Sequence, residues 1–370
     1  MTIALDGRAL VGPHAGIGWH TYHLIAALAR AAPSTRFAVF SHRPVDDPPE
    51  TPANVEWIGG RAVSGLFWQQ VSLARLVRSV GAELLHSTLG TLPVRLSVPA
   101  VVTLHDLTPR SLGGTHTWKS RIATGALLGR SLRHARRVIS VSEHTKRDAV
   151  RTFQIPGEKI VVIYNGIGAE FRPVRDARAL QKTRTAYAGG RPYFLFVGTL
   201  EPRKNLVRLV EAFAAFAARH AEPVLVLAGG RGWKDEPLWD AIRRFDLGRR
   251  VLRVGAVPPV ALPALYSAAT ALLFPSLHEG FGLPAAEAMA CGTPVLTSAV
   301  TALPEVVADA ALLVDPHSTR SIEEGIERMW GDASLRRRLA VRGPIRARRF
   351  RWDAAARQTL RVYEAVLRGE

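Results

Sequence analysis

Short apolar runs alternate with longer amphipathic stretches along almost the whole chain. The short runs are typical of buried strands, and the longer stretches have the spacing of helices that bury one face. Helices are expected, for example, at Trp19–Ala31, Leu206–Arg219 and Pro284–Ala290. Strands are predicted at Thr2–Leu5, Arg36–Ser41, Val55–Ile58, Leu84–His86, Ala100–Leu104, Arg137–Val141, Ile160–Ile163, Tyr193–Val197, Val224–Ala228, Val251–Val254, Ala271–Pro275, Val295–Ser298 and Ala311–Val314. This alternation predicts α/β architecture, in which parallel sheets are covered by helices.

A polar, arginine-rich segment interrupts this pattern between Asn165 and Arg191. With 370 residues, the chain suits two domains of roughly 150–200 residues each. We therefore expect two Rossmann-like, doubly wound domains facing across a cleft, because ligands bind beyond the carboxyl ends of the strands in such sheets. The first domain is one surface on which the last helix can pack. The expected boundaries are a first domain over 1–170, a linker over 171–190, a second domain over 191–350 and a C-terminal helix over 351–370.

The composition bears on disulfide bonds, membrane spans and the location of the protein. Apolar residues make up 47% of it, and its one cysteine, Cys291, excludes an intrachain disulfide. Cys291 is interpreted as a core residue at a helix end rather than as a nucleophile. Prolines break the longest apolar region, Val254–Leu277, which argues against a membrane span. The opening MTIALDGRAL resembles a first strand more than a signal peptide, so a cytoplasmic location is expected.

The formal net charge of +18 favours anionic partners. Nucleotides, phosphorylated lipids, an anionic membrane surface and nucleic acid all fit this charge. The absence of an RNA motif that combines aromatic and basic residues argues against nucleic acid. The segment Trp118–Arg137 has the composition of a helix lying on an anionic membrane, and an ordinary packed helix explains it equally well.

The stretch LHEGFGLPAAEAMACGTPV, Leu277–Val295, holds the candidate chemistry. It follows an apolar strand and begins with a glycine-rich loop. Pro284 suits the first turn of a helix, and Gly292 suits the position after its end. The N-terminus of a helix favours an anion, above all a phosphate.

Two glutamates, Glu279 and Glu287, stand beside this expected phosphate site. Carboxylates repel a diphosphate, but they accept hydrogen bonds from hydroxyl groups on either side of it. A nucleotide sugar has that arrangement, with ribose hydroxyls on one side and sugar hydroxyls on the other. In GTLEPRKNL, Arg203 and Lys204 stand at an expected helix start and would supply the positive charge.

These motifs together resemble one enzyme family. VGTLEPRKN followed by LHEGFGLPAAEAMACGTPV resembles the retaining glycosyltransferases of the large family 4 type, which have two Rossmann-like domains and include bacterial mannosyltransferases and glucosyltransferases. The family's mark is a glutamate, seven residues and a second glutamate, matched by Glu279 and Glu287. SVSEHTKRDAV and KIVVIYNGI also resemble family segments.

The resemblance implies a role for each matched position. Glu279 would contact hydroxyls of the donor sugar, Glu287 would accept from the ribose, and Arg203 and Lys204 would neutralise the diphosphate. The base would lie against backbone at Gly255–Val257. The backbone N–H groups facing the sugar and diphosphate would be those of Gly280, Phe281, Gly282 and Leu283. Some relatives have an arginine where this chain has Thr199, so Arg203 would take more of the phosphate load.

The first domain contributes a glycine-rich loop and a histidine. VGPHAGIGWH places Gly12, Gly16 and Gly18 between the first strand and a helix, where family members approach the donor phosphate and the acceptor. A dinucleotide fingerprint would need a further glycine where Thr21 stands, which weakens a dehydrogenase interpretation. Ordinary turn glycines remain an alternative.

In VVTLHDLTP, the resemblance implies that His105 faces the donor sugar. Asp106 would hold the tautomer of that imidazole or meet the acceptor hydroxyl. A histidine satisfied within the core is the other interpretation of His105.

The sequence thus predicts sugar transfer from a nucleoside diphosphate to a hydroxyl of a glycan or lipid-linked acceptor. The resemblance implies retention of configuration without a metal, slightly favours GDP-mannose over a UDP-sugar, and leaves the enzyme cytoplasmic or peripheral on the inner membrane face. No cofactor is expected: D-x-D, a Cys/His cluster and a P-loop are all missing from the sequence. Two alternatives stay open, a nucleotide-sugar epimerase of the same architecture and a non-catalytic protein that binds nucleotide sugars or nucleic acid.

Overall fold

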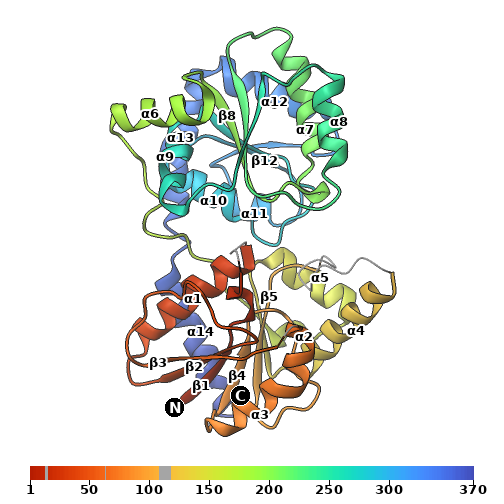
Figure 1. The fold of residues 1–370 in the computed structure, drawn as a ribbon, viewed down its shortest axis with the longest axis vertical. Coiled ribbons are helices and arrows are strands. Elements are labelled where there is room, and N and C mark those ends of the chain that lie inside the picture. The colour runs from red at the N-terminus through yellow and green to blue at the C-terminus, as the bar shows by residue number, and fades with distance from the viewer. Residues whose placement is uncertain (13–15, 63, 108–117) are drawn as a thin grey trace. The chain divides into compact units, whose positions relative to one another are not determined.

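The computed structural model describes residues 1–12, 16–62, 64–107 and 118–370, with 118–124 described by their backbone alone. It divides into two compact units. The first unit comprises Met1–Gly166 and Phe350–Glu370, and the second comprises Ile167–Arg349. Each unit is built around one parallel sheet with helices on both of its faces (Figure 1).

The sheet of the first unit has the strand order β3-β2-β1-β4-β5-β6-β7, and all of its pairs are parallel. Its strands are β1 (Thr2–Asp6), β2 (Arg36–Ser41), β3 (Val55–Gly59), β4 (Leu84–Ser87), β5 (Ala100–Leu104), β6 (Arg137–Ser140) and β7 (Ile160–Val162). Alternate residues of a strand point to opposite faces, so this sheet has two cores. Ile3 and Leu5 enter one core, and Ala4, between them, enters the other.

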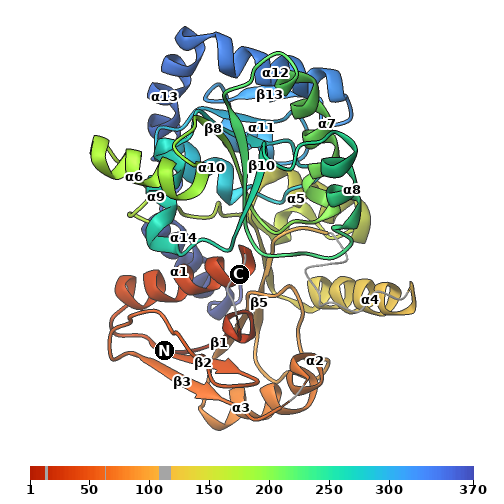
Figure 2. The ribbon, with the colours of Figure 1, turned by 45° about the horizontal axis from the view of Figure 1, so that its top comes forward.

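Different helices cover the two faces of this sheet. The helices are α1 (Gly16–Ala31), α2 (Gly65–Trp68), α3 (Ala74–Ser79), α4 (Trp118–His134), α5 (Glu143–Phe153) and α14 (Trp352–Leu367), with short turns at Arg8–Leu10, Gln69–Leu73 and Gly157–Lys159. Leu24 and Leu28 of α1 share a core with Tyr363 of α14, whereas Leu128 and Leu132 of α4 belong to the core on the opposite face. Figures 1 and 2 both show α1 and α14 side by side.

The sheet of the second unit has the order β10-β9-β8-β11-β12-β13, again with every pair parallel. Its strands are β8 (Tyr193–Val197), β9 (Val224–Ala228), β10 (Val251–Gly255), β11 (Ala271–Phe274), β12 (Val295–Ser298) and β13 (Leu312–Val314). The inner strands β8, β9 and β11 are almost wholly buried, as expected for strands covered on both faces.

The helices of the second unit also lie on both faces. They are α6 (Ala177–Ala188), α7 (Leu206–Ala217), α8 (Glu236–Arg244), α9 (Leu262–Ala268), α10 (Leu283–Ala290), α11 (Leu303–Val307), α12 (Thr319–Gly331) and α13 (Ala333–Ala347), with 3₁₀ turns at Pro202–Lys204 and Pro259–Ala261. Figure 2 shows α7 and α8 together on one side of the sheet and α6, α9 and α13 on the other.

The strand order decides where ligands can bind. In each sheet the order reverses beside the first strand, between β1 and β4 in one unit and between β8 and β11 in the other. Crevices beyond the carboxyl ends of strands at such reversals are the usual ligand sites of open α/β sheets. The two motif-bearing loops, Gly198–Asn205 and Ser276–Gly282, follow β8 and β11, so they lie at this position in the second unit.

The expected linker over 171–190 is wrong, because this segment is part of the second unit. Ala177–Ala188 forms α6, which begins with the side chain of Asp176 accepting from the backbone N–H of Arg178. Arg184 donates through Nε to the carbonyl of Ala268 at the end of α9. Arg178 and Arg184 therefore lie on a packed helix, whereas Arg172 and Arg175 are exposed residues before it. The C-terminal helix α14 packs within the first unit.

Three further expectations can be compared with the fold. Gly16 and Gly18 were expected in a loop, but α1 begins at Gly16, because its packing outweighs a glycine penalty of about 1 kcal/mol per residue. The described part of the segment from Trp118 to Arg137 buries Leu128 and Leu132, as a packed helix does, and the side chains of 118–124 lie outside the described residues. Of the helices that the structure describes, none has both the length and the apolar character that crossing a membrane requires.

Candidate active site

Backbone contacts hold the two loops of the second unit together. The N–H of Leu277, in the loop after β11, donates to the carbonyl of Arg203 over 2.9 Å. Asn205 has a left-handed conformation with φ of 62°, which ends the 3₁₀ turn Pro202–Lys204 before α7 begins. Its side-chain amide donates to the carbonyls of Pro275 and Pro316. Arg203 and Lys204 therefore lie in a fixed turn before α7. The sequence suggested the start of the helix itself.

Glu279 is buried between these two cations. Lys204 Nζ lies 2.6 Å from Glu279 Oε1, and Arg203 Nη1 lies 2.9 Å from Oε2. The exposed fractions of Glu279 and Lys204 are 6% and 7%. A carboxylate in an apolar setting needs such partners, because losing water without compensation costs several kcal/mol. The apolar company of Glu279 in the sequence is therefore explained by cations that come from a loop about 75 residues earlier in the chain.

The charges within this cluster balance. Arg203 also pairs with Glu201, 2.9 Å away, so two carboxylates face two cations. Burial by itself would raise the pKa of Glu279, but Lys204 and Arg203 hold the pKa at about 2. Glu279 is therefore ionised throughout the physiological range. Arg203 also donates to the carbonyl of His278 over 2.6 Å, which fixes the direction of its guanidinium.

The start of α10 requires a glycine. Gly282 caps the helix with φ of +94°, and a Cβ atom added there would lie 2.6 Å from Leu303 Cδ2. Phe281 is buried and anchors the loop that holds Gly280. Leu283 is the first residue of the helix, and Pro284 occupies the first turn, where its missing N–H costs nothing. The glycine-rich loop thus leads directly into a helix N-terminus beside the Glu279 cluster, as predicted.

Glu287 has different partners from Glu279. It lies one turn into α10, and Tyr266 of α9 donates its hydroxyl to Oε2 over 2.8 Å. Burial raises the pKa of Glu287 to about 7, the hydrogen bond from Tyr266 opposes this rise, and the charge of Glu170 adds to it. Glu287 therefore changes its protonation state near neutral pH. The pattern of the sequence did not single out Tyr266.

Two other residues of the second unit bear on the prediction. Val257 follows β10, the edge strand of the sheet and the second strand away from β8. Cys291 is 2% exposed at the end of α10, as expected of a core residue.

In the first unit, a backbone carbonyl fixes the tautomer of His105. His105 follows β5, and its Nε2 lies 2.9 Å from the carbonyl oxygen of Thr88. A carbonyl oxygen only accepts, so Nε2 carries the proton and Nδ1 keeps its lone pair. Burial is the main cause that lowers the pKa of His105, to about 4. His105 is therefore a neutral hydrogen-bond acceptor at Nδ1.

The expectation that Asp106 holds this tautomer is wrong, because Thr88 does so. Instead, His20 of α1 lies against His105, with the ring centroids 4.5 Å apart and the planes nearly perpendicular. His20 Nδ1 donates to Asn165 Oδ1 over 2.8 Å, and burial lowers its pKa well below the ordinary value. Sequence patterns missed both residues: Thr88 stands in no motif, and His20 ends the segment VGPHAGIGWH, of which only the glycines were interpreted. Both contact His105 because α1 and the carboxyl end of β4 come together in the fold.

Comparison with known proteins agrees with this arrangement in both halves of the chain. Residues 14–171 match the family model described as Glycosyltransferase Family 4, and residues 178–346 match that of Glycosyl transferases group 1. The O-antigen chain mannosyltransferase B of Escherichia coli is 37% identical over 281 residues, which cover 74% of this chain and 72% of the relative.

Solved structures are similar over nearly the whole length. The sucrose-phosphate synthase of Thermosynechococcus elongatus superposes with a TM-score of 0.82 at 25% identity and covers 100% of both chains. Anabaena HepE, solved in complex with UDP-glucose, superposes with a TM-score of 0.77 at 20% identity over 98% of this chain and 99% of its own. With two Rossmann-like domains, a buried Glu279 cluster at the strand-order reversal and matches in both halves, the chain belongs to the family 4 glycosyltransferases and is a glycosyltransferase.

Proposed function

We propose that the enzyme transfers mannose from a nucleoside diphosphate to a hydroxyl group of a growing glycan. The observation that carries the proposal is the position of Glu279. It is held ionised by Lys204 and Arg203, at the reversal of strand order and beside the N-terminus of α10. That arrangement offers an acceptor for sugar hydroxyls beside donors for a diphosphate. The E. coli relative is named an O-antigen chain mannosyltransferase, which supports mannose as the sugar.

Each group in the second unit has a proposed part in binding the donor. The helix N-terminus of α10 and the cations Arg203 and Lys204 meet the diphosphate, and Glu279 accepts from the sugar hydroxyls. Glu287 accepts from the ribose hydroxyls, and backbone near Val257 lies against the base. GDP-mannose is the proposed donor. Because Anabaena HepE was solved in complex with UDP-glucose, UDP-sugars are also tested as donors.

The proposed reaction builds negative charge on the departing diphosphate while the sugar becomes oxocarbenium-like. Arg203, Lys204 and the dipole of α10 stabilise that charge as it forms. His105 accepts a hydrogen bond from a sugar hydroxyl through the free lone pair of Nδ1. The acceptor hydroxyl attacks the face that the diphosphate leaves and gives its proton to the leaving phosphate. The configuration is thereby retained, and this chain's own cations and helix N-terminus provide the charge stabilisation without a metal.

The proposed acceptor is a glycan linked to a lipid. The name of the E. coli relative refers to the O-antigen chain, and the net charge of +18 suits a partner that carries phosphate. We place the reaction at the cytoplasmic face of the membrane, with the enzyme as a peripheral protein.

A transfer assay tests the proposal. The enzyme is incubated with GDP-mannose, UDP-sugars or ADP-sugars, a mannosylated acceptor and EDTA, and products are identified by mass spectrometry and anomeric NMR. We expect α-mannosyl transfer from GDP-mannose that EDTA leaves unchanged. Glu279→Gln and Lys204→Gln should lose most of the transfer, whereas the exposed-pair variant Glu211→Gln should keep it. Isomerisation of the donor alone, inversion, or full activity of Glu279→Gln would contradict the proposal.

A further inference from the structure

The helix α13 and the residues after it form a strongly basic stretch that begins in the second unit and ends in the first. Between Asp332 and Asp353 the chain contains no aspartate or glutamate. The arginines of this stretch are Arg336, Arg337, Arg338, Arg342, Arg346, Arg348, Arg349 and Arg351. Like charges this close repel one another, so an anionic partner within the fold or outside it relieves the repulsion.

Some of these arginines have partners within the fold. Arg336 donates to the carbonyl of Met329 at the end of α12 over 2.7 Å, and Arg346 donates to the carbonyl of Val306 in α11 over 2.8 Å. Arg342 and Arg351 pair with aspartates. Arg336 and Arg346 hold helices together, and Arg342 and Arg351 are neutralised by aspartates. The other four arginines of the stretch are not accounted for by these contacts.

The remaining arginines face solvent. Arg337, Arg348 and Arg349 are exposed, and no carboxylate among the described residues pairs with them. Arg338 is exposed and, among the described residues, donates to the hydroxyl of Ser334. The fold therefore presents a band of positive charge on the outer face of α13 that carboxylates among the described residues balance only in part.

Two large aliphatic side chains lie within this band. Val341 is 65% exposed and Ile345 is 59% exposed, one helical turn apart. The helical spacing puts Arg337 one turn before Val341 and Arg348 three residues after Ile345, on the same face. Water-exposed aliphatic residues bracketed by arginines are typical of helices that rest on a membrane surface, with apolar side chains in the interface and cations at the headgroups.

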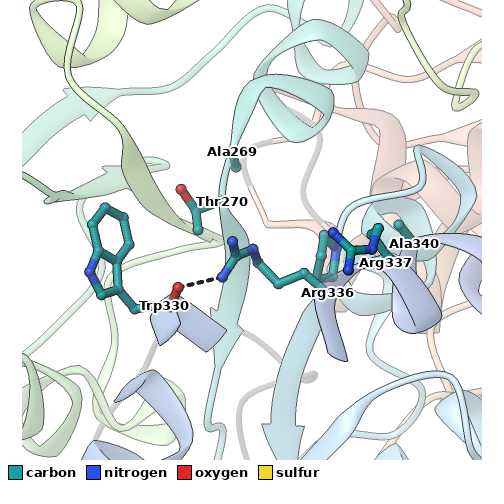
Figure 3. A pocket seen from close by; sticks show the side chains of 7 residues that line it. Ala269, Thr270, Trp330, Arg336, Arg337 and Ala340 are labelled. Carbon is teal, nitrogen blue, oxygen red and sulfur yellow. Dashed lines mark hydrogen bonds between the residues drawn. The ribbon is translucent and has the colours of Figure 1, made fainter. Parts of the chain in front are cut away.

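A hollow of about 410 Å³ lies beside this face. Figure 3 shows the guanidinium of Arg336 donating to the backbone carbonyl of Trp330, with Arg337 and Ala340 at the other end of the hollow and Thr270 also in its lining. Ala269, Pro294 and Trp330 complete the lining. Thr270 and Pro294 precede β11 and β12, so the hollow opens at the amino ends of the strands, opposite the edge that holds Glu279. It is thus separate from the candidate active site.

We propose that the outer face of α13 docks on an anionic phospholipid bilayer, with a headgroup phosphate in the hollow beside Arg336 and Arg337. This inference deepens the membrane association proposed above by naming the surface that makes it. Charge complementarity selects anionic lipid, and the exposed Val341 and Ile345 select a bilayer over a purely polar polyanion. Binding occurs without the sugar donor, since the hollow and the Glu279 cluster lie at opposite ends of the sheet.

Vesicle sedimentation tests the proposal with the full-length enzyme. Vesicles of phosphatidylcholine are compared with vesicles that also contain phosphatidylglycerol, and inorganic phosphate serves as a competitor. We expect binding to the anionic vesicles only, weakened by salt. Arg337→Glu/Arg348→Glu and, separately, Val341→Ser/Ile345→Ser should each weaken binding by about tenfold or more. Inorganic phosphate should compete only weakly, because it lacks the acyl interface.

Matched variants separate this surface from general charge and folding effects. Arg175→Glu/Arg178→Glu makes the same charge change at exposed positions near α6, and Val260→Ser removes an aliphatic side chain that is 88% exposed. Both controls should bind vesicles as the wild type does. All variants should keep the wild-type circular dichroism and the transfer rate to a water-soluble acceptor.

Three results would overturn the inference. The first is equal vesicle binding by the α13 variants and the controls. The second is binding to an RNA oligomer that falls with the arginine variant but not with Val341→Ser/Ile345→Ser, which would identify a polyanion surface. The third is full displacement from vesicles by inorganic phosphate. Loss of sugar transfer with intact vesicle binding would count against the proposed reaction alone.

Discussion

At the scale of single residues, Glu279 and Glu287 show how surroundings divide one side-chain type into two roles. Glu279 has two cations within 3 Å and stays ionised. Glu287 has a tyrosine hydroxyl and the like charge of Glu170, so burial dominates and its pKa rises to about 7. The motif in the sequence identifies both glutamates, but it contains none of the partners that set their ionisation.

Glu279→Gln is expected to destabilise the second unit. The substitution leaves Lys204 buried without its counter-charge, and breaking a buried pair costs on the order of 3 kcal/mol. Urea unfolding of wild type and variant at neutral pH measures the difference. Glu211→Gln, which breaks an exposed pair with Arg244, should cost less than about 1 kcal/mol. Equal losses for the two variants would show that burial of Glu279 has no energetic consequence.

The raised pKa of Glu287 makes stability depend on pH in a defined direction. The folded state keeps the proton up to about pH 7, whereas the unfolded chain loses it near 4.5, so this contribution is complete below 4.5 and is lost as the pH rises to 7. Glu287→Gln mimics the protonated form. Its stability relative to wild type should rise between pH 5 and pH 7.5, by at most roughly 3 kcal/mol. A difference that does not change with pH, in urea titrations across this range, would contradict the assignment.

At the scale of elements, the C-terminal helix α14 completes the first unit rather than the second. Trp352, Ala356 and Tyr363 belong to the core that α1 forms on the sheet. Tyr363 also hydrogen-bonds through its hydroxyl to Nδ1 of the buried His86, 2.5 Å away, and His86 contacts Thr103 Oγ1 on its other side. The last helix thus supplies both apolar surface and a polar partner to a part of the chain nearly 280 residues earlier.

Tyr363→Phe should therefore destabilise the first unit by about 1–3 kcal/mol, because a buried imidazole nitrogen loses its partner. Thr359→Val is the matched control, since the hydroxyl of Thr359 donates to the carbonyl of Ala355 within the same helix. Thermal denaturation should show a clear shift for the first variant and a small one for the second. The same shift for both would mean that His86 does not depend on α14.

The cap of α10 gives a second prediction at this scale. Gly282→Ala puts a Cβ atom against Leu303 and forces a non-glycine residue to φ of +94°, which costs roughly 1–3 kcal/mol. Because the same loop leads to the helix N-terminus, nucleotide affinity should fall together with stability. Gly248→Ala, which meets no neighbouring atom within 4 Å, should change neither quantity. Calorimetric titration with GDP measures the affinity, and unchanged binding by Gly282→Ala would contradict the role of this cap.

The strands were predictable from the sequence because buried parallel strands are short and almost wholly apolar. Runs such as Tyr193–Val197 and Val224–Ala228 have no other plausible structure, and the structure has strands with these bounds. The helix α6 and the start of α1 were not predicted, because their local sequence has no such clear pattern. The glycines at the start of α1 contradict local propensity, and packing against α14 decides the outcome there. The arginine-rich segment that contains α6 suggested a connector, although arginine favours helices, and α6 packs against α9.

At the scale of the whole molecule, the reversal of strand order explains why motifs far apart in the sequence meet. In the chain, the strands β9 and β10 lie between the loop after β8 and the loop after β11, but β8 and β11 are neighbours in the sheet. The sequence predicted which loops carry the chemistry of the second unit. It could not predict that Arg203 and Lys204 pair with Glu279, because such a pairing depends on the backbone contact between Leu277 and Arg203.

A crystal structure of the enzyme with GDP-mannose bound tests the central claim most directly. The account predicts the diphosphate at the N-terminus of α10, within hydrogen-bonding distance of Arg203 or Lys204. It also predicts the mannose hydroxyls on Glu279 and the ribose hydroxyls on Glu287. A nucleotide seated elsewhere, or one that leaves both glutamates without contact, would contradict the claim that this loop binds the activated sugar.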